Sequence, residues 1–206
     1  MEPRIRDAER RAYRYWYEDG LIDILLGMFL LLVGATSVLE EVPLPEGLAI
    51  AAGVVRIVVV VVAALVLRRI VRRLKERVTY PRTGYVAYRR RPGWLRWLKV
   101  GTGVTAGAII GLLSVSQSGV VQWLPVLAGT LIGAALLYAG VRFDLTRYHA
   151  LALVSVLAGG VAAWLALSST LRLALLLGIV GLAAVVAGVV TLIGYLRRNP
   201  RQEGDL

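Results

Sequence analysis

The chain contains no cysteine and only one histidine, His149. Without cysteine the protein has no disulfide, no thiolate nucleophile and no Cys-based metal site. A single histidine cannot build the clustered ligand patterns of zinc or haem proteins. The polar stretch 114–119 supplies serines without a paired histidine and acid, so a serine nucleophile has no support. We therefore expect no metal, no cofactor and no enzymatic activity.

Apolar residues, in contrast, are in excess. They make up 58% of the chain, and the mean hydropathy is +0.70, whereas soluble domains are about 45–50% apolar. They gather in runs near the length of about 20 residues that crosses the hydrocarbon of a bilayer. We predict an all-α, polytopic membrane helix bundle that forms a single domain over 1–206. Its six predicted spans are 21–39, 48–67, 98–115, 120–140, 150–167 and 173–196.

The net charge is +11, and the basic residues fall almost entirely on one side of the predicted membrane. The opposite connections contain a single basic residue, Arg172. By the positive-inside rule, both termini are cytoplasmic in a multi-pass protein of a prokaryotic cell membrane. The basic segments are an N-terminal amphipathic helix at the interface within 1–20, a loop at 68–97 between helices 1–2 (21–67) and helices 3–6 (98–196), the connection 141–149 and the tail 197–206.

Two charged residues fall inside predicted spans, where burial is costly and a functional role is the first hypothesis. Asp23 lies in the first turn of its span, on the same face as Gly27 and Gly34. It is predicted to point inward, either as a structural salt bridge or as a proton or cation site. Arg56 either faces the bundle or extends toward the outer headgroups. The candidate partners of Asp23 are the arginines of 68–91, Arg142 and Arg147.

Small residues spaced four or seven apart let membrane helices approach closely. Span 173–196 carries two such four-residue pairs, Ala174 with Gly178 and Ala184 with Gly188. These patterns suit either the core of a monomer or, through span 98–115, a homodimer. The predicted packing glycines elsewhere are Gly27, Gly34, Gly103, Gly107, Gly111, Gly129 and Gly133.

The loop 68–97 is predicted to have structure of its own. The apolar stripe of span 48–67 continues to Val78, so that helix should leave the membrane and end before Pro81. A compact turn follows, formed by Tyr80, Pro81, Gly84, Tyr85 and Tyr88. Its basic surface consists of Arg68, Arg69, Arg72, Arg73, Arg77, Arg82, Arg89, Arg90 and Arg91.

These arginines and tyrosines are also the residue types that bind nucleic acid. However, they lie within a few residues of membrane spans on both sides, where the nearest phosphates belong to anionic lipid headgroups. We therefore expect no nucleic-acid partner. The expected partners are membrane lipids, anionic ones above all, and a partner membrane protein or a second copy of the chain.

Two stretches resemble a group of small prokaryotic integral membrane proteins of unknown function. They read EDGLIDILLG at 18–27 and TYPRTGYV at 79–86. The resemblance implies an integral membrane protein, and it brings no substrate, cofactor or catalytic residue.

The sequence therefore predicts a non-enzymatic integral membrane scaffold, assembly or regulatory protein. Its basic cytoplasmic face would bind anionic lipid or an acidic partner. The alternative is a small transporter or channel that uses Asp23 and Arg56.

Overall fold

The computed structural model describes residues 17–78 and 122–199. Within these ranges it is helical and contains no strand. Five helices are long and apolar enough to cross a membrane, which confirms the predicted class of an all-helical protein with membrane-length helices. They are α2 (Leu21–Val38), α3 (Glu46–Val78), α6 (Leu124–Phe143), α7 (Thr146–Trp164) and α8 (Ser169–Arg198), with a short 3-10 turn, η1 (Leu39–Glu41), after α2.

Several predicted features lie outside these ranges, and the count of six spans and the side of the termini therefore stay predictions. The features are the amphipathic helix within 1–16, the turn formed by Tyr80, Pro81, Gly84, Tyr85 and Tyr88, and the span 98–115 with Gly103, Gly107 and Gly111.

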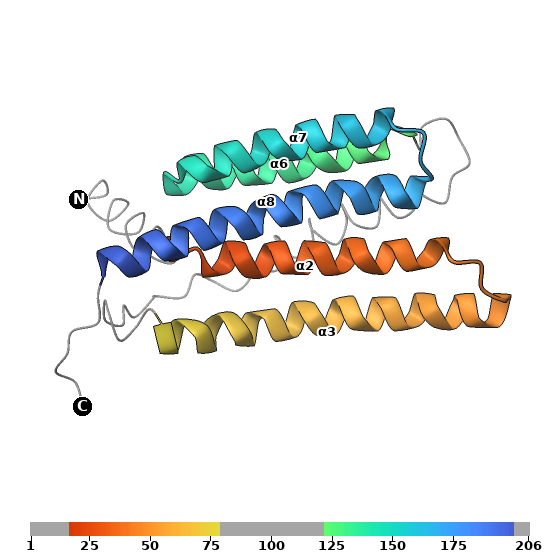
Figure 1. Ribbon diagram of the computed structural model, residues 1–206, viewed down its shortest axis with the longest axis horizontal. Helices are drawn as coiled ribbons and strands as arrows, with labels where there is room; N and C mark the ends of the chain where they lie inside the picture. Colours follow the sequence, from red (N-terminus) through yellow and green to blue (C-terminus); the bar gives the residue numbers. More distant parts are fainter. Residues whose placement is uncertain (1–16, 79–121, 200–206) are drawn as a thin grey trace, which may run out of the picture.

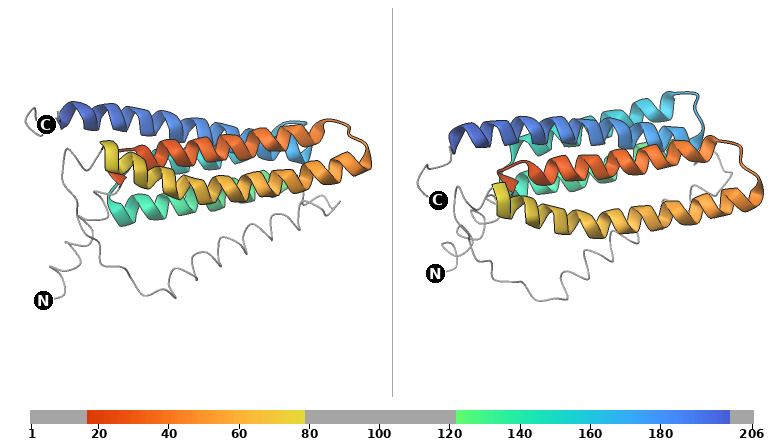
Figure 2. Two further views of the ribbon diagram at one scale, coloured as in Figure 1. Left: turned by 90° about the horizontal axis from the view of Figure 1, so that it is seen from below. Right: turned by 60° about the horizontal axis from the view of Figure 1, so that its bottom comes forward.

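The five helices run side by side along the long axis of the molecule (Figures 1 and 2). α2 packs mainly on α8, and α6 packs on α7. α8 also contacts α7 and joins the two pairs, while α3 lies outside α2. One end of the bundle gathers most of the basic residues that lie within 17–78 and 122–199, and we call it the Arg-rich end. Its basic residues include Arg69, Arg73, Lys75, Arg142, Arg147, Arg197 and Arg198.

Glycines set the close approach of α2 to α8. A Cβ atom on Gly27 would lie 2.5 Å from the carbonyl oxygen of Gly181, so no methyl group fits there. Of the two four-residue pairs predicted in α8, Ala174 with Gly178 does not pack in this way through Gly178, where a Cβ atom would have nothing within 4 Å. Instead, both helices use a seven-residue spacing. The opposed positions are Gly20 with Gly188, Gly27 with Gly181, and Gly34 with Ala174.

The pair α6–α7 is equally close. A Cβ atom on Gly129 would lie 2.6 Å from the carbonyl oxygen of Ser155, and one on Gly133 would lie 3.0 Å from that of Ala152. The buried Ser155 hydroxyl donates a hydrogen bond of 2.9 Å to the Gly129 carbonyl, which satisfies the hydroxyl inside the apolar bundle. The adjoining core consists of Ala128, Ala158, Ala162, Leu176 and Val180.

One loop prediction was too long. The connection predicted at 141–149 is only Asp144 and Leu145, because Asp144 adopts a left-handed conformation (φ 56°) that ends α6 and turns the chain into α7. The helix of the predicted span 48–67 does continue to Val78, as its apolar stripe predicted, so the first part of 68–97 is the end of α3. Hydropathy indicates which part of a helix is apolar enough for lipid. The helix itself can continue through polar residues beyond that part.

Candidate functional site

Asp23 lies at the Arg-rich end, buried between α2 and α7, with only 2% of its surface exposed. One carboxylate oxygen, Oδ1, accepts a hydrogen bond of 2.5 Å from the Tyr148 hydroxyl. The other, Oδ2, lies 2.7 Å from Nε of Arg147. The Nε–H does not point along this contact, so the pair is held by charge rather than by a linear hydrogen bond. Both oxygens of Asp23 are therefore occupied by side chains of α7.

Arg147 is held in place by more than Asp23. Its Nη2 donates a hydrogen bond to the carbonyl oxygen of Tyr17. Its guanidinium carbon also lies 5.3 Å from the ring centroid of Tyr148, a cation–π distance. The Tyr17 ring stacks on Phe143 at 5.0 Å and meets Tyr148 edge-on at 6.2 Å. Contacts with Asp23 of α2, with Tyr148 of α7 and with Tyr17, which precedes α2, thus fix a cation that is 19% exposed.

A second buried ion pair joins α2 to α3. Nζ of Lys75 lies 2.5 Å from Oδ2 of Asp19, and both side chains are almost fully buried. The other oxygen of Asp19 accepts the backbone N–H of Leu21 at 3.2 Å, in the uncapped first turn of α2. Burying two charges is favourable only when they are paired with good geometry. The two ion pairs, Asp19 with Lys75 and Asp23 with Arg147, therefore hold the Arg-rich end together, and we call them the latches.

A small cavity of about 30 Å³ adjoins Asp23 and Tyr148. Its other lining residues are apolar, among them Leu26, Leu136 and Val180. The cavity is a local pocket beside the latch.

Arg56, the second predicted intramembrane charge, lies far from Asp23. Its Nη2 donates a hydrogen bond of 2.7 Å to Oγ of Ser37, so the side chain turns toward α2. Ser37 is buried and is fourteen residues beyond Asp23 in the same helix, which corresponds to about 21 Å along the axis. The two charges therefore have separate partners near opposite ends of α2.

The predicted basic surface is described only in part. Arg69 and Arg73 belong to α3 and have exposed side chains. Arg68, Arg72 and Arg77 also belong to α3. Four further arginines of this predicted surface lie outside the described residues: Arg82, Arg89, Arg90 and Arg91.

Sequence reasoning placed Asp23 on an inward face and named Arg147 among its candidate partners. It missed Tyr148 and Lys75. Tyr148 adjoins two other polar residues, Arg147 and His149, and Lys75 lies in a run of arginines, so neither stood out. Asp19 lies before α2, which begins at Leu21, so helical spacing does not relate it to Asp23.

Comparison with protein-family models, with curated proteins and with solved structures gave no match. The resemblance to small prokaryotic membrane proteins therefore stays a prediction. In the two described ranges, no group of three or more His, Cys, Asp or Glu residues could hold a metal ion. The class that the fold defines is an all-helical protein with five helices able, by length and composition, to cross a membrane.

Proposed function

We propose that this protein is a non-enzymatic integral membrane protein of the assembly or regulatory kind, and that its Arg-rich end binds anionic lipid headgroups. The observation that carries the proposal is the division of charge at this end. The buried acids Asp19 and Asp23 each have a basic partner from another helix. The side chains of Arg69, Arg73, Arg197 and Arg198 are exposed.

This division leaves positive charge on the surface while the interior is balanced. An anionic bilayer surface attracts each nearby arginine by about 1 kcal/mol. Arg197 and Arg198 occupy the last turn of α8, where a basic residue also suits the helix dipole. The latches support this role, because a rigid end presents its arginines in a constant arrangement.

The transporter alternative would need Asp23 and Arg56 to serve one pathway. Asp23 is instead held by Arg147 and Tyr148 at one end of α2, and Arg56 is held by Ser37 near the other. Fixed partners of this kind favour structural roles for both charges. We therefore prefer the lipid-binding proposal.

The test is a lipid titration of the purified protein in mild detergent, followed by native mass spectrometry. Anionic phosphatidylglycerol should bind more tightly than phosphatidylcholine. Replacing Arg69→Gln and Arg73→Gln together should remove about 2 kcal/mol, or about 30-fold in affinity for the anionic lipid. Arg172→Gln, which removes the same type of charge at the opposite end, is the control and should bind normally.

Two results would overturn the proposal. One is equal affinity of the unaltered protein for phosphatidylglycerol and phosphatidylcholine. The other is an equal loss of affinity in Arg172→Gln and in the double variant, because net charge alone would then explain the binding.

A further inference from the structure

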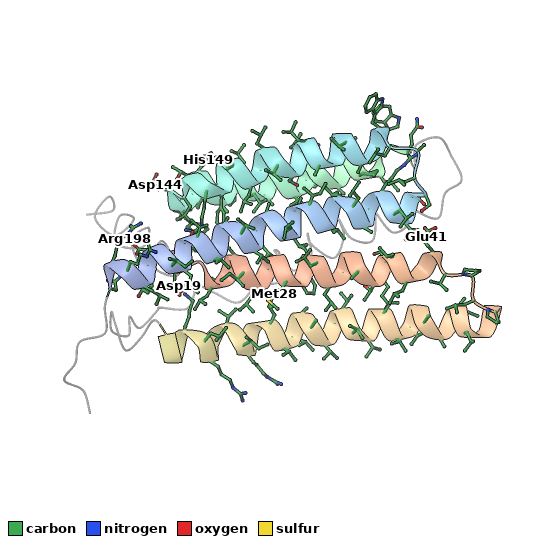
Figure 3. All side chains as sticks on the ribbon, in the orientation of Figure 1. Asp19, Met28, Glu41, Asp144, His149 and Arg198 are labelled. Atoms are coloured by element: carbon green, nitrogen blue, oxygen red, sulfur yellow. The ribbon has the colours of Figure 1, made fainter. Side chains whose placement is uncertain are left out.

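A second cavity, of about 370 Å³, opens at the Arg-rich end between the start of α7 and the end of α8. Its volume is within the range typical of small-molecule sites. Figure 3 shows Asp144 and Arg198, two of its lining residues, at this end of the bundle. Arg69 and Arg73 do not line it, and of the residues of the two buried ion pairs only Arg147 does.

The charged residues that line the cavity carry both signs. Glu18 and Asp144 are acidic, whereas Arg147 and Arg198 are basic. A site for a simple anion would not need two carboxylates, and a site for a simple cation would not need two guanidinium groups. The lining therefore suits a ligand that carries a negative and a positive group together. Uncharged hydrogen-bonding groups complete the wall: Thr146, Thr191, Tyr195 and Asn199.

The basic side of the cavity suits a phosphate. Arg147 is already oriented by its contacts with Asp23 and Tyr17, so ordering it for a ligand costs little. Its Nε faces Asp23 and its Nη2 bonds Tyr17, which leaves the Nη1 group of Arg147 for a phosphate oxygen. Arg198 offers a guanidinium fork whose geometry matches phosphate oxygens. The first turn of α7 has no side-chain cap and no acidic residue. Its backbone N–H groups and the helix dipole therefore add to the attraction for an anion beside Arg147.

The acidic side suits a primary ammonium, which can donate three hydrogen bonds to carboxylate oxygens. Glu18 and Asp144 are both exposed, so they are reachable from the surface. Because the cavity lies where α7 begins and α8 ends, it is at the level expected for the headgroups of a surrounding bilayer.

We propose that this cavity binds a phosphoethanolamine group, the zwitterionic headgroup of a phospholipid, with the phosphate at Arg147 and Arg198 and the ammonium at Glu18 and Asp144. The inference rests on the proposed function only in placing the Arg-rich end at a membrane surface. It shares Arg198 with the proposed anionic surface, adds Arg147 and two carboxylates, and concerns a lipid of different charge.

The test is again a titration followed by native mass spectrometry, with phosphatidylethanolamine, phosphatidylcholine and phosphatidylglycerol as probes. Phosphatidylethanolamine should bind at least tenfold more tightly than phosphatidylcholine, whose quaternary ammonium donates no hydrogen bond. Arg198→Gln and Glu18→Gln should each lower that affinity about tenfold. Both side chains are exposed, and so these variants should fold. Arg197→Gln is the matched control, because Arg197 is exposed beside Arg198 but does not line the cavity. This variant should lower the affinity for phosphatidylglycerol and leave that for phosphatidylethanolamine unchanged.

Soluble phosphoethanolamine distinguishes the two sources of the same headgroup. Weak competition, at concentrations far above those of the lipid, supports a phospholipid. Competition as effective as that of the lipid would overturn the lipid assignment in favour of a free phosphoethanolamine.

The site itself would be refuted by equal binding of phosphatidylethanolamine and phosphatidylcholine, or by equal losses in Arg197→Gln and Arg198→Gln. Each of the two proposals can be refuted without refuting the other. If this site is wrong, the preference for phosphatidylglycerol and its dependence on Arg69 and Arg73 should persist. If the anionic surface is wrong, selectivity for phosphatidylethanolamine should remain in the variant that lacks those two arginines.

Discussion

Replacing Gly27→Ala should weaken the contact between α2 and α8. The new Cβ atom would lie 2.5 Å from the carbonyl oxygen of Gly181 and 2.7 Å from the backbone nitrogen of Val185. Ordinary contact begins near 3.4 Å, so the helices would have to separate locally by 3.4 − 2.5, about 0.9 Å. The obstacles are backbone atoms of α8, which cannot rotate away. Inserting a methyl group into such a contact costs about 1–3 kcal/mol.

The matched control is Gly178→Ala, also in the bundle, where the added Cβ atom would have nothing within 4 Å. Alanine favours a helix over glycine by up to about 1 kcal/mol, and this gain applies to both variants. The difference in the free energy of unfolding between the two variants therefore measures the cost of the close contact at Gly27. We expect Gly27→Ala to be less stable than Gly178→Ala by about 1–3 kcal/mol.

The assay is reversible unfolding in mixed micelles with a rising fraction of sodium dodecyl sulfate, followed by tryptophan fluorescence. The midpoint and slope give the free energy of unfolding for each variant. Equal stability of Gly27→Ala and Gly178→Ala would show that α2 and α8 are not in contact at Gly27 and Gly181, and the packing described above would be wrong.

Three further outcomes are expected. Asp23→Asn should lower the free energy of unfolding by about 3 kcal/mol, because removing one partner leaves the cation of Arg147 buried without its counter-charge, and the partial exposure of Arg147 keeps the loss at the low end. The double variant Asp23→Leu with Arg147→Leu should lose less than the sum of the single variants in the same unfolding assay, and strict additivity would show that the pair does not interact. Because the native chain has no cysteine, single cysteines can report the topology in intact cells: Glu41→Cys should react with a membrane-impermeant maleimide from outside, and Arg197→Cys should react only after the cells are opened. Labelling of both from the same side would contradict the position of Glu41 and Arg198, the neighbour of Arg197, at opposite ends of the bundle in Figure 3.

Helix positions could be predicted well from the sequence wherever an apolar run is continuous. The predicted span 21–39 differs from α2 by one residue at its end, and 173–196 lies inside α8. The prediction was poorer between α6 and α7, where Arg142, Arg147 and Tyr148 interrupt the apolar pattern. These residues are polar but helical, because the backbone hydrogen bonds of a helix do not depend on side-chain hydropathy. Hydropathy therefore placed the start of α7 four residues late.

The candidate site could be predicted only to the level of one face of one helix. The spacing of Asp23, Gly27 and Gly34 indicates an inward-facing carboxylate, and the surplus of arginines indicates a basic partner. Nothing in the spacing distinguishes Arg147 from other arginines of the same side. The distinction comes from the turn at Asp144, which brings the first turn of α7 against the first turn of α2.

By itself, the sequence determined the class of protein, because length, apolar excess and the spacing of small residues are properties of each helix alone. Only the tertiary structure decided which helices meet and which charges are paired. The seven-residue glycine spacing of α2 is readable in one segment, but its match in Gly188, Gly181 and Ala174 requires α8 to run antiparallel in one register. That register depends on steric fit between two backbones, and the partners of Asp19 and Asp23 depend in turn on where α3 and α7 lie against α2.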